Sequence, residues 1–175
     1  ETAASHLGQS AVRLEPTWMQ IAESAAWATV LAIQNNQTPA DIDVSILQRT
    51  VADQNSMISF FNDIALDDGA PYNAAVQWAG TKGFFATYNA CPHELLDTHT
   101  AHHWIEGFLQ LKNGMLDANQ LARRLASFPS GKPITHTQFK DALHEEGESI
   151  TSEISDAEPL KRGTACLILY NAFYK

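Results

Sequence analysis

The second half of the sequence contains an internal repeat, and this repeat restricts the possible folds more than any other feature. Five matched pairs share a constant offset of 64 positions: Gly83 with Gly147, Ala79 with Leu143, Leu96 with Leu160, Ala101 with Ala165, and Trp104 with Ile168. Each copy reads as a helix, a glycine, a loop and a second helix, because a glycine just after the last apolar position is typical of a left-handed helix stop. The repeat therefore predicts a module of short helices.

Apolar residues recur at spacings of three and four in both copies and between them, which predicts helices with one buried face. They are Ala75, Val76 and Ala79 in the first copy, Leu121, Leu125 and Phe128 between the copies, Phe139, Ala142 and Leu143 in the second copy, and Cys166, Leu169, Tyr170 and Phe173 in the last helix, which is expected to begin near Leu160. Asp117 is expected to cap the helix over residues 116–128. The predicted fold class is all-α.

The first half begins with a predicted arm over residues 1–13, followed by a long alanine-rich helix. Pro16 stands where a first-turn proline is tolerated, and Trp18, Ile21, Ala22, Ala25, Ala28, Thr29 and Ala32 follow at helical spacing. The helix is expected to run for about five turns. Its small side chains allow close approach, either of another helix, which is the commoner explanation, or of a flat ligand.

Asn35, Asn36 and Pro39 are expected to end the long helix, and Asp43 to cap a short second helix with Val44, Leu47 and Val51 on its apolar face. The apolar run over residues 57–61 is interpreted as extended, buried and a boundary between subdomains. Two domains are therefore expected. Residues 1–56 form an arm and two helices, and residues 57–175 form the helical repeat module.

The charge balance restricts the partners of the chain. The formal net charge is −9, and an acidic surface repels phosphate backbones and anionic membranes, so nucleic acid is not an expected partner. The longest stretch without charged residues, residues 24–40, contains five consecutive polar positions and is not expected to span a membrane. Two cysteines leave the compartment open, with a secreted or periplasmic location among the alternatives.

Three segments share a motif that opens a helix: residues 96–101, 160–165 and, as a third copy, 134–139. This pattern resembles S-layer homology modules, in which a glycine ends one helix and a Leu-Thr-Arg-Ala type motif opens the next. Arg162 keeps the arginine of that motif. The resemblance implies degenerate helical repeats and, as an alternative function, a non-enzymatic binding or interaction module with a protein or cell-wall partner.

Segments of the first half occur in an order that resembles another family. These are residues 12–21, the alanine-rich helix, and residues 41–44, 58–64 and 76–85, which together are similar to the C-terminal part of a bacterial FAD-dependent oxidoreductase family. In such enzymes the N-terminus of the last flavin helix points at the isoalloxazine ring and can stabilise negative charge on a reduced flavin. The resemblance implies FAD as the cofactor and places Arg13, Glu15, Met19 and Gln20 beside it.

The sequence departs from that family in two respects. Family members typically have Gly-Glu-Ala-Ala-Gly in this helix, whereas residues 22–26 here read Ala-Glu-Ser-Ala-Ala and are followed by Trp27. No Gly-x-Gly-x-x-Gly turn occurs in the sequence, although a flavin enzyme of this type needs one to hold the pyrophosphate. The chain is therefore expected to be a C-terminal fragment or remnant, to lack catalysis and bound FAD by itself, and to have a nucleotide-binding domain as its missing partner.

Further candidates for chemistry are three histidines and two cysteines. His99, His102 and His103 have i, i+3, i+4 spacing, which places them on one side of a helix with Glu106 one turn further on. A zinc or nickel site is geometrically possible. Exposed histidines at a helix start are the commoner explanation, so no metal ligand is assigned. Cys166 is expected in the core, and a disulfide with Cys91 stays open.

Overall fold

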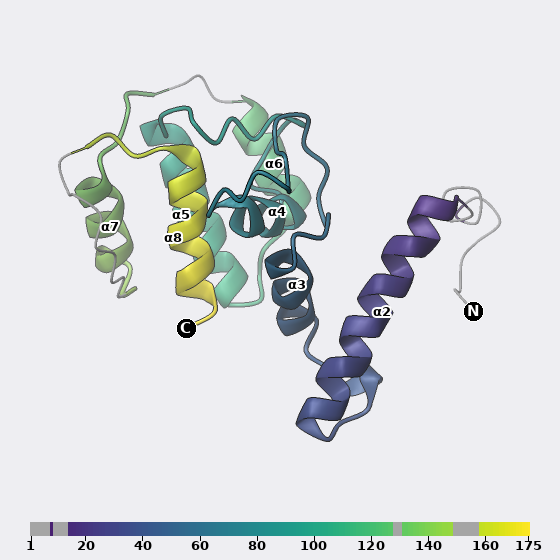
Figure 1. Cartoon of the computed structure of the whole chain (residues 1–175). Coiled ribbons are helices and arrows are strands. Elements are labelled where there is room, and N and C mark those ends of the chain that lie inside the picture. The colour runs from purple at the N-terminus through teal and green to yellow at the C-terminus, as the bar shows by residue number, and fades with distance from the viewer. Residues whose placement is uncertain (1–7, 9–13, 128–130, 149–157) are drawn as a thin grey trace. The chain divides into compact units, whose positions relative to one another are not determined.

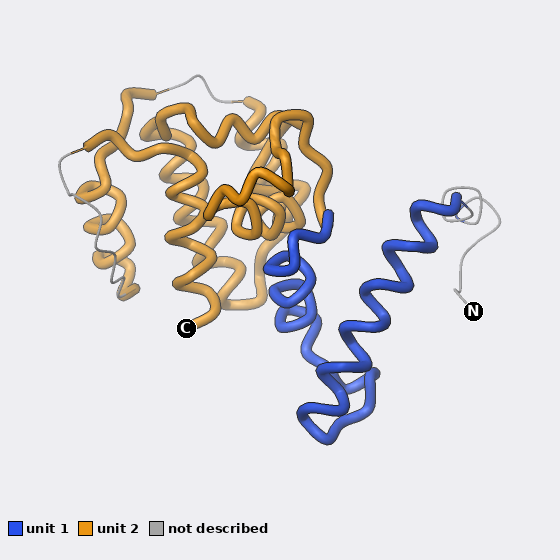
Figure 2. Tube along the Cα trace, in the orientation of Figure 1, with its two compact units in different colours: residues 1–57 blue, residues 58–175 orange. Residues whose placement is uncertain are grey.

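The computed structural model describes residues 8, 14–127, 131–148 and 158–175. The arm expected over residues 1–13 lies outside the described residues except at Gly8. The chain forms two compact units, unit 1 (residues 1–57) and unit 2 (residues 58–175) (Figure 2).

The described residues form seven α-helices and one short 3-10 helix, with no β-strand beyond isolated bridges, so the all-α prediction is confirmed (Figure 1). In chain order the elements are α2 (Glu15–Asn35), η1 (Pro39–Asp41), α3 (Val44–Asp53), α4 (Asn73–Thr81), α5 (Thr98–Lys112), α6 (Ala118–Ser127), α7 (His136–Glu145) and α8 (Arg162–Phe173).

Unit 1 is a helical hairpin of α2 and α3 joined through η1. The expected end of α2 is confirmed: Asn36 takes a left-handed conformation with φ 54°, and the next amide, of Gln37, donates to Ala32 O at 2.9 Å. The expected cap of α3 is also confirmed, because Asp43 Oδ1 accepts from Ser45 N at 2.7 Å. Both signals are local, so the sequence is sufficient to predict them.

The interpretation of residues 57–61 as buried is wrong. Met57 is 45% exposed and Phe60 57%, while Phe61 is buried. The segment forms no strand; the backbone amides of residues 58 and 59 instead donate to the side-chain oxygen of Gln77, at 3.0 and 2.8 Å. The buried side-chain amide of Gln77 thus binds the backbone of this segment in place of a neighbouring β-strand. Without a β-sheet, the segment is not required to place every second side chain in the core.

Unit 2 encloses the main hydrophobic core of the described chain, into which α4 and α8 pack against each other. The indole N–H of buried Trp104 donates to Phe84 O at 2.7 Å, so its polar atom is satisfied inside the core. The largest side chains with almost no exposure are Trp78, Trp104, Phe84, Phe108, Phe139, Leu96, Leu143, Leu160 and Leu169. Phe85 is also buried, whereas Tyr88 is 69% exposed.

Both glycine stops predicted from the repeat are confirmed. After α4, Gly83 has φ +78° and the following amide, of Phe84, donates to Ala79 O at 3.2 Å. After α7, Gly147 has φ +86° and the following amide, of Glu148, donates to Leu143 O at 2.9 Å. The left-handed glycine turns the chain back so that a carbonyl of the last helical turn is satisfied.

The three motif segments meet in unit 2 and form a closed ring of backbone hydrogen bonds, the three-segment ring. Leu96 N donates to Leu160 O at 2.7 Å, Leu160 N to Ile134 O at 2.8 Å, and Ile134 N to Leu96 O at 2.9 Å. The three side chains are buried, and α5, α8 and α7 begin just after them. α8 begins at Arg162, two residues after Leu160, so the expected start near Leu160 is confirmed.

Candidate functional site

The N-terminus of α2 carries three of the four residues expected to lie near flavin; Arg13 lies outside the described residues. Glu15 and Met19 are four residues apart and share a helix face, on which Met19 is 73% exposed. Gln20 lies on another face, where its amide donates to Glu23 Oε2 at 3.4 Å. Leu14 provides no side-chain hydrogen bond to the first turn, so within the described residues this helix start has no side-chain cap.

The surface of α2 is apolar, and little of it is covered. Ala32 is the only buried residue of this 21-residue helix, whereas Met19 and Ile33 are 73% and 76% exposed. Further exposed side chains are Trp18, Ile21, Ala22, Ala25, Ala26 and Val30.

Several polar side chains of α2 are satisfied by the carbonyl groups of the helix itself. Ser24 Oγ donates to Gln20 O at 3.0 Å, and Thr29 Oγ1 donates to Ala25 O at 2.8 Å. Asn35 Nδ2 makes the equivalent bond, to Leu31 O at 2.9 Å. These side chains can be covered by another protein surface without losing a hydrogen bond, since they need no water to remain paired.

In unit 2, Arg162 lies in the wall of a pocket of about 240 Å³. Its Nε donates to Ala90 O at 3.0 Å, and its guanidinium lies 5.3 Å from the ring centre of Trp104 and 5.6 Å from that of Phe85. Glu94, Asp97, His99, His103 and Cys91 also line this pocket. The pocket is therefore polar and carries charges of both signs, with the motif arginine held in place by two aromatic rings.

Asp97 connects this pocket to the start of α5. Its Oδ1 accepts from the amides of His99, Thr100 and Gly131 at 3.0, 3.0 and 3.1 Å, and its Oδ2 accepts from Thr100 Oγ1 at 2.7 Å. Burial raises the pKa of this carboxyl, but the hydrogen bonds donated by Thr100, Gly131 and His99 outweigh burial and lower the pKa overall. Asp97 is therefore a charged cap that also binds the segment before the third motif copy.

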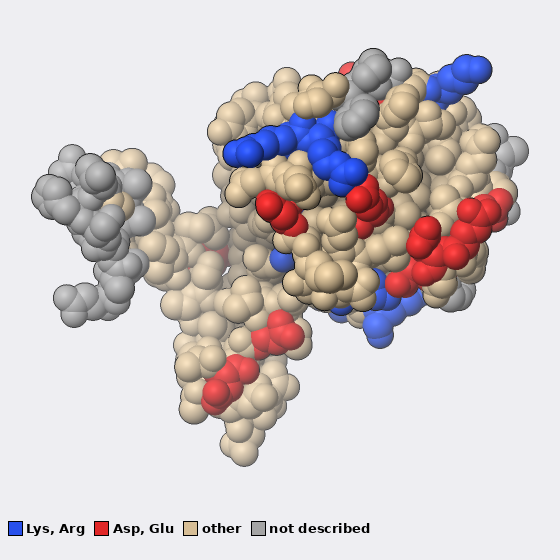
Figure 3. Space-filling model, turned by 180° about the vertical axis from the view of Figure 1, so that it is seen from behind, with Lys and Arg blue, Asp and Glu red and all other residues tan. Residues whose placement is uncertain are grey.

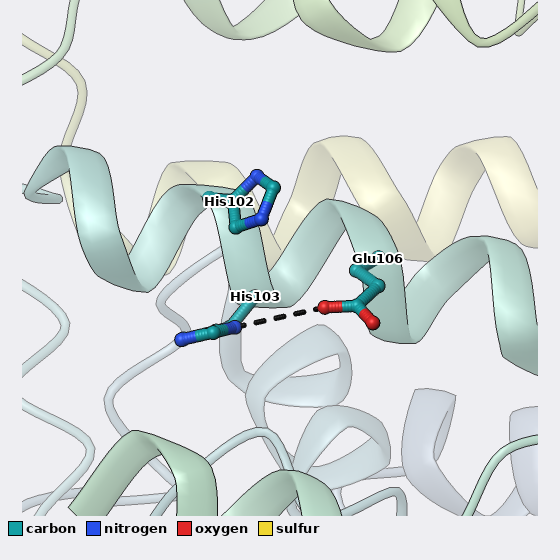
Figure 4. A group of neighbouring side chains, drawn as sticks. All are labelled: His102, His103 and Glu106. Carbon is teal, nitrogen blue, oxygen red and sulfur yellow. Dashed lines mark ion pairs between the residues drawn. The ribbon is translucent and has the colours of Figure 1, made fainter. Parts of the chain in front are cut away.

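The three histidines of α5 do not share one side as expected. His99 and His103 line the Arg162 pocket, whereas His102 lines a second pocket, of about 390 Å³, next to α7. The structure brings His102 and His103 together with Glu106 and leaves His99 out of that group (Figure 4). The i, i+3, i+4 spacing therefore predicted that residues of α5 lie close together, but the group consists of His102, His103 and Glu106 rather than of the three histidines.

The two cysteines are free thiols, so the structure contains no Cys91–Cys166 disulfide. Cys166 is fully buried on α8, as expected for a core residue, and burial raises its pKa to about 12 while the Arg162 charge partly opposes that shift. A thiol with this pKa stays protonated at neutral pH and is a poor nucleophile.

Comparison with known proteins identifies one family. Residues 2–51 match the family model of FAD dependent oxidoreductases. No curated protein and no solved structure matches the chain. The matched residues include α2 and most of α3, and with them Glu15, Met19 and Gln20, whereas unit 2 lies outside the match.

The helices of the structure bear on the expectation that the chain does not span a membrane. Among the described residues, none of the helices has the combination of length and apolar character that crossing a bilayer requires.

Proposed function

We propose that the chain is the C-terminal portion or remnant of an FAD-dependent oxidoreductase-like protein, in which unit 1 supplies the helix beside the flavin. The chain is not catalytic by itself, and FAD reaches it only together with a nucleotide-binding domain. The observation that carries the proposal is the exposed apolar surface of α2 inside the region that matches the family. The absence of a Gly-x-Gly-x-x-Gly turn from the sequence supports the need for that second domain.

The exposed apolar face of α2 supports the proposal that this helix binds a protein partner. Large apolar patches on a folded protein mark interaction sites, and Met19, Val30 and Ile33 remain 73%, 40% and 76% exposed. The small side chains of Ala22, Ala25 and Ala26 permit close approach along the same helix. A nucleotide-binding domain of the matched family is the occupant that this surface fits.

The start of α2 suits a flavin because, within the described residues, no side chain caps the backbone N–H groups of Glu15 and Thr17, whereas Pro16 between them has no N–H. Free N–H groups and the positive end of the helix dipole stabilise a negative charge, such as that of a reduced isoalloxazine. In this proposal Arg13, Glu15, Met19 and Gln20 border the flavin, and Arg13 adds a positive charge.

The test is co-expression with an FAD-binding domain of the same family, followed by co-purification and measurement of flavin absorbance. We expect a flavin-containing complex, and no stable flavin on the chain alone. Ile33→Glu should weaken the association, whereas Gln34→Glu, which adds the same charge at the next, polar position, should not. Failure of the wild-type chain to associate would contradict the proposal.

Flavin proximity is tested separately in that complex. Arg13→Ala should lower the flavin content per complex, while the amount of associated chain stays constant. An unchanged flavin content would remove Arg13 from the site, even if the two proteins still associate.

A second candidate function concerns unit 2, which we propose as a non-enzymatic binding module of the S-layer-homology type. The three-segment ring supports it because three equivalent motif segments surround one centre, and the Arg162 pocket lies beside them. The test is co-sedimentation with purified cell-wall polysaccharide. Arg162→Ala should abolish co-sedimentation, and Lys161→Ala, which removes an exposed positive charge next to it, should leave most of it; absence of binding by the wild-type chain would contradict this candidate.

A further inference from the structure

We infer that α5 carries a binding site for a divalent transition-metal ion, formed by His102, His103 and Glu106 (Figure 4). Each side chain offers one ligand atom, and the three atoms lie within 4.8 Å of one another. Two imidazoles and one carboxylate form a ligand set that suits Zn²⁺. The site is independent of the proposed flavin segment, because all three residues belong to unit 2.

The helix places the three ligands within one turn. Glu106 follows His102 by four residues and His103 by three, so both histidines are neighbours of the carboxylate on the helix surface. Ligand atoms about 2.0–2.1 Å from a tetrahedral zinc ion lie about 3.3 Å apart. His103 Nδ1 and Glu106 Oε2 are 3.7 Å apart, and all three ligand atoms lie within 4.8 Å of one another. Tetrahedral coordination therefore requires the pair to move slightly closer and the exposed His102 to turn toward it.

The carboxylate of Glu106 is held in the orientation that the site requires. Its Oε1 accepts from Arg124 Nη1 of α6 at 2.9 Å and from Gln110 Nε2 at 3.2 Å. Its Oε2 is thereby directed toward His103. Hydrogen-bond partners of this kind orient ligands in metal sites, because they fix one oxygen and leave the other for the ion.

The surrounding charges favour a cation overall. Arg124 is the nearby positive group and opposes metal binding, but Glu145 and Glu146 of α7 line the same pocket as His102 and Glu106. The chain as a whole has a formal charge of −9, and Figure 3 shows acidic side chains in a row on one face of unit 2, so its long-range field also attracts cations. Since three protein ligands leave a coordination position open, a water molecule can complete the coordination shell.

The test is isothermal titration of the full chain, without a histidine tag, with Zn²⁺, together with metal analysis after dialysis. We expect one ion per chain. His102→Gln and Glu106→Gln should each weaken binding at least about tenfold, the lower end of the loss seen when only a partner of a ligand is removed. His144→Gln, a histidine on α7 outside the group, is the matched control and should bind as the wild type does.

A thermal shift gives a second readout. Zn²⁺ in excess should raise the unfolding midpoint of the wild type and of His144→Gln by the same amount, and that of His102→Gln by less, because a ligand that binds the folded chain stabilises it in proportion to the logarithm of its affinity. His102 is exposed, so its replacement is not expected to prevent folding, and circular dichroism checks this. Absence of bound metal in the wild type, or wild-type affinity in His102→Gln or Glu106→Gln, would overturn the assignment.

Discussion

Replacement of Asp97 by alanine should destabilise unit 2 more than replacement of any exposed helix cap. The carboxylate accepts four hydrogen bonds, three of them at the start of α5 and the fourth from the Gly131 amide, 34 residues away. One side chain therefore caps a helix and also holds a distant segment next to the three-segment ring.

The magnitude follows from these contacts. Removal of an N-cap side chain costs about 1 kcal/mol. The bond to Gly131 adds about 1 kcal/mol, the usual net value of one hydrogen bond. We add nothing for the negative charge of the Asp97 carboxylate, because this side chain is partly exposed and solvent screens its charge. We expect Asp97→Ala to lower the free energy of unfolding by about 2 kcal/mol.

Asp117 provides the matched control at the start of α6. Its carboxylate is exposed and accepts from the Gln120 amide at 3.0 Å, a single bond within the same helix start. Asp117→Ala should cost about 0.5 kcal/mol, the lower end for an exposed cap. Urea unfolding followed by tryptophan fluorescence measures both variants, since Trp78 and Trp104 are fully buried in unit 2.

The pH dependence of the stability lost in Asp97→Ala tests this reasoning. The pKa of Asp97 is lower in the folded chain than its ordinary value of 3.8, so the carboxylate stabilises the fold above pH 3.8 and this contribution is lost as the pH falls through the folded-state pKa. The difference between wild type and Asp97→Ala should therefore be full at pH 7 and shrink below pH 3.8. Equal costs for Asp97→Ala and Asp117→Ala, or a difference that grows in acid, would refute the reasoning.

Two further predictions concern a glycine and a cysteine of unit 2. Gly83→Ala should cost more than about 2 kcal/mol in unfolding free energy, because its φ of +78° disfavours a side chain and the new Cβ would clash with the backbone carbonyl of Ala118. Gly114→Ala is the control: with φ +68° and open space around it, it should lose only the roughly 1 kcal/mol of backbone strain. Equal losses in urea titrations would contradict this prediction. Cys166 should react with a thiol reagent only after unfolding, whereas the less buried Cys91 should react in the native chain. Mass spectrometry measures the labelling of each cysteine. Rapid labelling of both in the native chain would contradict the close packing of α8.

Helix ends could be predicted from the sequence because their signals are local. Asp43 binds an amide two residues away, and Asp117 binds one three residues away. Gly83 and Gly147 reverse the chain within a single turn, so the identity of these residues carries the information.

Burial at residues 57–61 could not be predicted in the same way. An apolar run indicates only that burial of its side chains would be favourable. In the structure Gln77 binds the two backbone amides between Met57 and Phe60, and both of these side chains are exposed. The histidines show a similar limit. Helical spacing relates residues on one element, but the neighbouring helices decide which pocket His99 and His102 enter.

The sequence by itself determined the helical class, the ends of several helices and the segments that share a motif, since all of these depend on interactions within a few residues. Only the tertiary structure decided that Leu96, Ile134 and Leu160 close into one ring, and that Asp97 reaches Gly131. It also directed Glu106 toward His103 by fixing its other oxygen with Arg124 of a different helix. These contacts join residues far apart in the chain, and they form only when helix packing brings their backbone and charged groups within hydrogen-bond distance.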